Sequence, residues 1–215
     1  MSFEVDHVFV AASCGAPQAE DLVEAGFAEG PANHHPGQGT ACRRFFFENA
    51  YLELAWLVDF AEASSREARR IGVRERVATE SGASHAGICL RARDPTEPLP
   101  VDTWSYTPSY IPQGTAIPIA ANSARLDEPL LFFLPAGLVP LKPEDVHPNG
   151  ARRLSSVRLT LPQRLHLSSE LTWLAQSGIV EVELAETESV SLVIDGGRVG
   201  DSVALDAAVP LELSW

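Results

Sequence analysis

One order of elements occurs near both ends of this chain: a strand, a helix and then three strands. Residues 4–11 alternate between apolar and polar side chains, Pro17 can open a helix that ends near Gly26, and extended segments follow from Phe27, at 43–47 and at 51–58. The same order returns as a strand at 154–161, a helix at 163–176 and strands at 179–185, 189–195 and 209–214. This repetition predicts an α+β fold of repeated βαβββ units with mixed sheets, packed by pseudo-symmetry.

The segment between the two repeats is less regular. Residues 61–84 are polar and predict a connecting helix, and strands are expected at 86–92, 116–120 and 130–134. Long stretches rich in Pro separate these strands, so residues 85–150 read as a degenerate second unit. We therefore expect a first unit over 1–60, the connecting helix, this second unit, and a third unit over 151–215, all within one compact domain.

Composition excludes several classes of partner. The formal charge is -13, and the arginines between 66 and 76 alternate with glutamates, so no positive face is expected for nucleic acid or an anionic membrane. No apolar run approaches the roughly 18 residues of a membrane helix. Three cysteines in no zinc-like spacing favour a reduced, cytoplasmic protein. The loop at 31–39 lacks the Lys-Ser/Thr of a phosphate loop, so no nucleotide cofactor is expected.

Two short strands in the first unit each carry one polar residue among apolar neighbours. His7 lies in DHVFV and Glu53 lies in YLEL. A buried imidazole or carboxylate is costly unless it is paired, binds metal or takes part in chemistry, so this half of the chain should hold the site. The alternative is a buried hydrogen bond between His7 and Glu53 that only joins two strands.

Five segments resemble a known superfamily: DHVFVA (6–11), HPGQGTACRRFFFENAYLEL (35–54), SHAGICLRARD (84–94), LLFFLP (130–135) and HPNGARRLSSVRLTLP (147–162). The chain resembles the glyoxalase-like branch of the vicinal-oxygen-chelate superfamily, which includes glyoxalase I, extradiol dioxygenases and fosfomycin-resistance proteins. The resemblance implies paired units whose curled sheets form a cup around a divalent metal. We expect residues 4–58 and 85–135 to form that cup, with the last unit extending the sheet or contacting a second copy in a homodimer.

The resemblance also implies particular ligands. His7, Glu53 and His85 match metal-ligand positions, for Zn, Ni, Mn or Fe, and Glu53 would also be the catalytic residue that ligates or shuttles a proton. The fourth position departs from the pattern, because Pro135 stands where relatives often carry a carboxylate. Glu128 is close in sequence but has the opposite strand parity, so a bulge would be needed to turn it inward.

Five further residues are candidates for substrate contacts. Each has a structural alternative: a turn for His35 and His147, a surface ion pair for Arg43, and simple packing for Tyr51 and Trp104. Three functions stay open at this point. They are a metal-dependent lyase, isomerase or dioxygenase for a small carbonyl or oxygen-rich substrate, a metal-free protein that binds or sequesters a small ligand or drug, and a domain that serves only in assembly.

Overall fold

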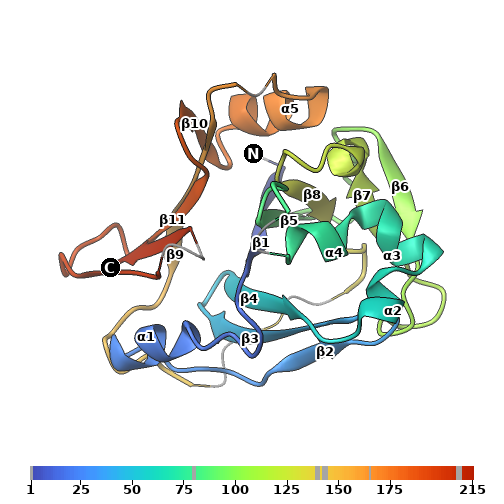
Figure 1. Ribbon diagram of the computed structural model, residues 1–215. Helices are drawn as coiled ribbons and strands as arrows, with labels where there is room; N and C mark the ends of the chain where they lie inside the picture. Colours follow the sequence, from blue (N-terminus) through green and yellow to red (C-terminus); the bar gives the residue numbers. More distant parts are fainter. Residues whose placement is uncertain (1, 79–80, 139–140, 142–144, 165, 207–209) are drawn as a thin grey trace.

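The computed structural model describes residues 2–78, 81–138, 141, 145–164, 166–206 and 210–215, and it contains two sheets (Figure 1). The first sheet has eight strands and uses the first two thirds of the chain. The second has five strands and uses the last third. None of the helices in these ranges has the length and apolar character that crossing a bilayer requires.

The eight-stranded sheet is a pair of similar halves. Its order is β2 (Asn33–His35), β3 (Thr40–Phe46), β4 (Tyr51–Leu57), β1 (Phe3–Ala11), β5 (Ala86–Ala92), β8 (Leu130–Phe133), β7 (Ile117–Ala120) and β6 (Thr103–Tyr106). In each half the first strand runs parallel to the last, β1 with β4 and β5 with β8, and the halves join through antiparallel β1 and β5. The sheet curls strongly into a half-barrel, so the expected α+β cup formed by residues 4–58 and 85–135 is confirmed.

Short helices close one end of the curled sheet. The expected connecting helix is in fact three, α2 (Phe60–Ala63), α3 (Arg66–Ile71) and α4 (Val73–Arg76). The Ser65 side chain caps α3, and Gly72, at a φ of +65°, ends it in the left-handed conformation that glycine tolerates. Their buried residues pack against Ala11 and Ala55 on the inner face of the sheet.

The two halves differ in their helices. In the first half, α1 (Ala19–Glu24) follows β1, as the sequence predicts. In the second half, the described chain has no helix between β5 and β6, and the 3-10 turn η1 (Ala121–Ala124) follows β7 instead. The Pro-rich composition of residues 94–118 accounts for this loss, because proline removes helix hydrogen-bond donors.

The last third of the chain begins like the first unit but joins its strands differently. Its elements are β9 (Leu154–Pro162), α5 (Ser169–Ser177), β10 (Glu181–Ala185), β11 (Ser189–Ile194), β12 (Ser202–Ala204) and β13 (Leu211–Ser214). Here β10 lies parallel to β9 on one side and β11 antiparallel on the other, giving the order β10-β9-β11-β13-β12. The segment therefore neither copies the first unit nor extends its sheet, and it forms a layer of its own (Figure 1).

Both faces of the central strands are buried, and the two faces serve different purposes. Val8, Leu52 and Ile88 have no exposed surface and share one core with Leu159 and Leu192 of the second sheet. The alternate residues of the same strands point to the other side, into the cup, because successive strand residues face opposite ways. Figure 1 shows α2, α3 and α4 on this cup side, away from the second sheet.

Candidate functional site

A cavity of about 410 Å³ occupies the cup. Most of its wall is apolar, with Phe9, Ile119, Leu130 and Phe132 from the sheet and Ile71 and Val73 from the short helices. Polar groups gather mainly on the first half of the cup, on β1 to β4. A mostly apolar cavity of this size with a few polar groups at one side is typical of small-molecule sites.

The pairing of β1 with β4 sets the polar side of the cavity. His7 lies opposite Tyr51 in the register, and Phe9 lies opposite Glu53. The His7 and Tyr51 rings stack with centroids 4.4 Å apart. His7, Tyr51 and Glu53 thus lie side by side on the inner face, and all three line the cavity as the sequence analysis expects of ligand-contacting residues.

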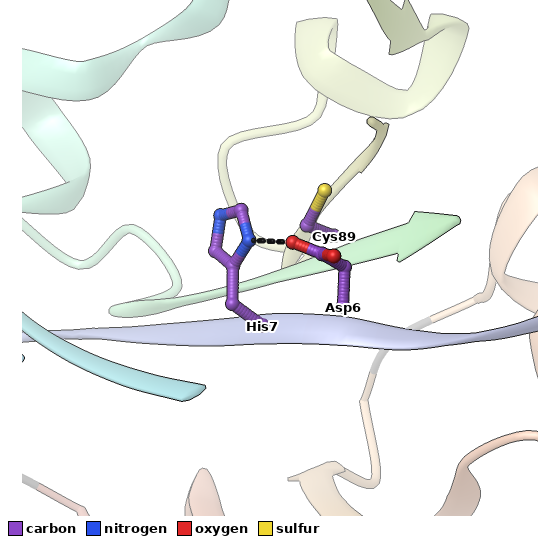
Figure 2. A group of neighbouring side chains, drawn as sticks. All are labelled: Asp6, His7 and Cys89. Carbon is purple, nitrogen blue, oxygen red and sulfur yellow. Dashed lines mark hydrogen bonds and ion pairs between the residues drawn. The ribbon is translucent and has the colours of Figure 1, made fainter. Parts of the chain in front are cut away.

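Asp6 holds the His7 ring in one orientation. The Nδ1–H of His7 donates to Asp6 Oδ1 at 2.8 Å, and Figure 2 shows the second ring nitrogen on the side away from Asp6. Arg91 donates to the other Asp6 oxygen at 3.0 Å. Burial by itself would raise the pKa of Asp6, but the hydrogen bonds and charges of His7 and Arg91 hold it below its ordinary value. The expected hydrogen bond from His7 to Glu53 is not formed.

Glu53 is buried in the cup without a counter-charge. Its residue exposure is 7%, and apart from the Cys42 thiol beside it, no group in the described ranges forms a hydrogen bond or ion pair with its carboxylate. Arg44 is its partner across the β3–β4 register, yet Arg44 Nε donates to the Pro31 carbonyl and the guanidinium lies over the Phe46 ring. A buried carboxylate left this way is costly to the fold.

His35 lies next to Glu53 but does not neutralise it. Asn33 Nδ2 lies 3.1 Å from His35 Nε2, and His35 Nδ1 lies 3.0 Å from Thr40 Oγ1, so both ring nitrogens have partners. Burial, the largest cause, lowers the pKa of His35, and the ring is therefore neutral at pH 7. His35 lines the cavity, in the place that the sequence analysis expects for a substrate contact.

The expected metal ligands do not meet. In the antiparallel pairing of β1 with β5, His7 lies opposite Cys89, and His85 accepts a backbone hydrogen bond from Ala11 farther along. The pair of Phe9 and Gly87 lies between these two positions. The Phe9 ring covers Gly87, since a Cβ atom built on Gly87 would lie 2.0 Å from Phe9 Cε1. His85 is not part of the cavity wall, and its Nδ1–H donates to the Arg76 carbonyl at 2.9 Å. Among the described residues, no group of donor atoms within 4.8 Å of one another contains both His7 and His85, so the two do not form a shared metal site.

Two other groups of donor atoms lie within 4.8 Å of one another: Asp6, His7 and Cys89 (Figure 2), and His35, Cys42 and Glu53. In both groups the protein already uses several of the donors. Both Asp6 oxygens have partners, both His35 nitrogens have partners, and burial raises the pKa of both cysteine thiols. Since a thiol and an imidazole must give up their protons and partners to bind metal, these sets do not fit a resident ion.

The carboxylate nearest in sequence to the fourth expected position is also used elsewhere. Pro135 lines the cavity and offers no ligand. Glu128 is fully buried and accepts from both the backbone N–H and the hydroxyl of Ser168, each at 2.7 Å. Because Ser168 caps α5, Glu128 anchors the start of that helix rather than a metal.

Three predicted substrate contacts lie outside the cavity. Arg43 pairs with Glu29 and Glu20 on the outer face of β3, where its neighbour Phe45 joins the core between the sheets. Because successive strand residues face opposite ways, only one of Arg43 and Arg44 can face the cup, and that residue is Arg44. Both faces of β3 carry a phenylalanine, so these residues do not indicate which face lines the cavity.

Trp104 and His147 serve packing instead. The Trp104 ring lies under the Arg70 guanidinium at 3.9 Å, in a second groove on the outside of α3. His147 lies between Phe27 and Phe47, and its Nδ1 accepts from the Ala28 N–H at 2.9 Å. The aromatic residues that do line the cavity from this part of the chain are Tyr106 and Tyr110.

Comparisons with known proteins agree with this fold. A family model described as a glyoxalase-like domain matches residues 5–99, which span the first half of the cup, β5 and the start of the segment after it. Among curated proteins, none matches this sequence.

One solved structure with a TM-score above 0.5 shows a similar fold at low sequence identity, and two further matches have lower scores. A hypothetical protein from Staphylococcus aureus is 10% identical with a TM-score of 0.55, and the match covers 100% of this chain and 99% of that one. A hypothetical protein from Bacillus halodurans is 15% identical with a TM-score of 0.42, over 66% of this chain and 100% of that one. A xylose isomerase-like TIM barrel/4-hydroxyphenylpyruvate dioxygenase fusion protein is 15% identical with a TM-score of 0.49, over 89% of this chain and 36% of that one. The resemblance seen in the sequence is confirmed over residues 5–99, which match the model of a glyoxalase-like domain.

Proposed function

We propose that the cup binds a small organic molecule, with its apolar part against Phe9, Leu130 and Phe132 and a polar group toward Glu53. The observation that carries this proposal is the 410 Å³ cavity, whose apolar wall surrounds a buried carboxylate that forms no ion pair with any described cation. Apolar surface gives such a site its affinity, and the few polar groups select and orient the ligand.

Binding in this proposal needs no resident metal. The alternative from the sequence is a metal-dependent lyase, isomerase or dioxygenase with His7, Glu53 and His85 as ligands. The separation of His7 from His85, and the internal partners of the other donor groups, favour the metal-free binding protein instead. Glu53 keeps a functional role as the group that the ligand would touch. A homodimer and a cytoplasmic location stay predictions from the sequence.

A fluorescent probe tests the proposal directly. N-phenyl-1-naphthylamine is uncharged and largely apolar, and it should bind protein that has been treated with EDTA and found free of metal by elemental analysis. Leu130→Trp places an indole in the cavity, because Leu130 lines it, and should abolish the fluorescence gain. Leu184→Trp is the matched control, since Leu184 is 47% exposed on β10 in the other sheet.

The outcomes separate the two interpretations. Equal probe binding by the Leu130→Trp variant and the parent would contradict the cavity as the site. One equivalent of tightly held metal, or probe binding that disappears with EDTA and returns with Zn²⁺, would contradict the metal-free part of the proposal.

A further inference from the structure

Resting on the proposed function, we infer that the ligand class of this cup is organic cations, such as protonated amines with an apolar body, and that Glu53 supplies the counter-charge. The inference starts from Glu53, which is more than nine-tenths buried and lines the cavity without an ion pair to any described cation. A carboxylate in a low-dielectric site is stabilised most by a positive charge or a strong hydrogen-bond donor at contact distance.

The protein's own cations near the cavity are engaged elsewhere. Arg44 donates to the Pro31 carbonyl and lies over Phe46, with its guanidinium carbon 5.0 Å from the ring centroid. Arg76 is fully buried, and its guanidinium donates to the backbone carbonyls of Ile71, Glu128 and Arg125. Neither arginine forms an ion pair with Glu53 in the described structure.

The imidazoles and the thiol near Glu53 form no ion pair with its carboxylate either. His35 has partners on both nitrogens, and the Nδ1–H of His7 points at Asp6 rather than at Glu53. The Cys42 thiol is a weak donor. The polar side of the cup therefore offers a buried carboxylate without an ion pair to a described cation, and a cationic N–H donor is the group that this carboxylate would bind most strongly.

The surrounding rings suit the same ligand. Phe9, Phe132, Tyr106 and Tyr110 line the cavity around this polar side. Aromatic faces attract a cation through their quadrupole, and they shield its apolar substituents from water at the same time. A carboxylate and several rings in one cavity thus favour an ammonium group over a neutral or an anionic head group.

Three probes with one body and different charges test the inference. 4-Phenylbutylamine, 4-phenylbutanol and 4-phenylbutyrate should be measured for displacement of N-phenyl-1-naphthylamine from metal-free protein at pH 7. We expect the amine to bind at least about 10-fold tighter than the alcohol, and the carboxylate to bind weakest. Glu53→Gln should remove the preference for the amine while the alcohol still binds, and circular dichroism should show an unchanged fold.

Arg44→Gln is the matched control, because Arg44 lines the same cavity opposite Glu53 and carries the opposite charge. It should keep or increase the preference for the amine. Equal binding of amine and alcohol by the parent, or an amine preference that survives Glu53→Gln, would overturn the inference while the fluorescent probe still bound. Failure of the fluorescent probe itself to bind would instead overturn the proposed function.

Discussion

The contact between Phe9 and Gly87 makes a sharp prediction, because it decides both the packing of β1 on β5 and the shape of the cup. Gly87 has no side chain, and a Cβ atom at this position would lie 2.0, 2.6 and 2.7 Å from three carbons of the Phe9 ring. Ordinary carbon contacts are about 3.5–4.0 Å, so Gly87→Ala requires the ring to move by more than about 1 Å.

The expected cost follows from two opposing effects. Overpacking of this kind destabilises by about 1–3 kcal/mol. Replacing a glycine that does not need a positive φ restricts the unfolded chain and returns about 0.4–1 kcal/mol. Since the Phe9 ring borders the cavity and has room to move, we expect a net loss of about 1–2 kcal/mol in the free energy of unfolding for Gly87→Ala.

A double-mutant cycle in urea checks the reasoning. Phe9→Ala removes the ring, so Gly87→Ala in that background should be neutral or slightly stabilising, which gives a coupling energy of about 1–2 kcal/mol between the two sites. The displaced ring should also enter the cavity and weaken probe binding in the Gly87→Ala single variant. The same loss of stability with and without Phe9 would refute the contact as the cause.

Three further predictions concern titratable groups. Folding lowers the pKa of Asp6, so its ionisation stabilises the protein at pH values above the unfolded pKa of about 3.9. This contribution is lost as the pH falls through the folded pKa. Asp6→Asn should therefore flatten the acid side of a curve of stability against pH, measured by urea unfolding. Folding also lowers the pKa of His35, so on acidification the unfolded chain takes up this proton before the folded protein does. The stability of the fold should therefore decrease as the pH drops below about 6.5. An NMR titration should show His35 protonating below that pH, and a titration midpoint above it would contradict the burial of the ring. A thiol reagent at pH 8 should modify the exposed Cys14 in the native protein and spare Cys42 and Cys89, which burial protects; three equally fast thiols would contradict the closed cup.

Local pattern was enough to predict which residues of two strands face the cup, whereas the cup itself was expected from the resemblance to a known superfamily. Alternation along 4–11 and 51–58 placed His7 and Glu53 on one face of their strands, and the structure puts both in the wall of the cavity. Strand parity depends only on the geometry of an extended chain, so it survives folding unchanged. The order of strand, helix and three strands likewise predicted the first half of the eight-stranded sheet, although β2 (Asn33–His35) lies within the segment 31–39 that was expected to be a loop.

Strand alternation could not predict which side chains contact one another in the folded protein. The sequence cannot show that the Phe9 ring covers Gly87 or that Glu128 anchors Ser168, because each contact joins segments far apart in the chain. Nor does strand alternation show that His85 Nδ1 donates to the Arg76 carbonyl, because this contact depends on how the helices before β5 fold back. Those contacts decide that the expected metal ligands stay apart.

Periodicity also could not distinguish two buried faces. Arg43 and Arg44 alternate along β3, and the face with more phenylalanine is the one that packs against the second sheet, so the arginine in the cup is Arg44. The last third of the chain shows the same limit, since its strand and helix pattern repeats the first unit while its strand order does not. The sequence by itself determined the elements, their facing and the half of the chain that carries the site. The tertiary structure decided which face encloses the cavity and which polar groups remain unpaired in it, because both depend on contacts between strands that periodicity does not encode.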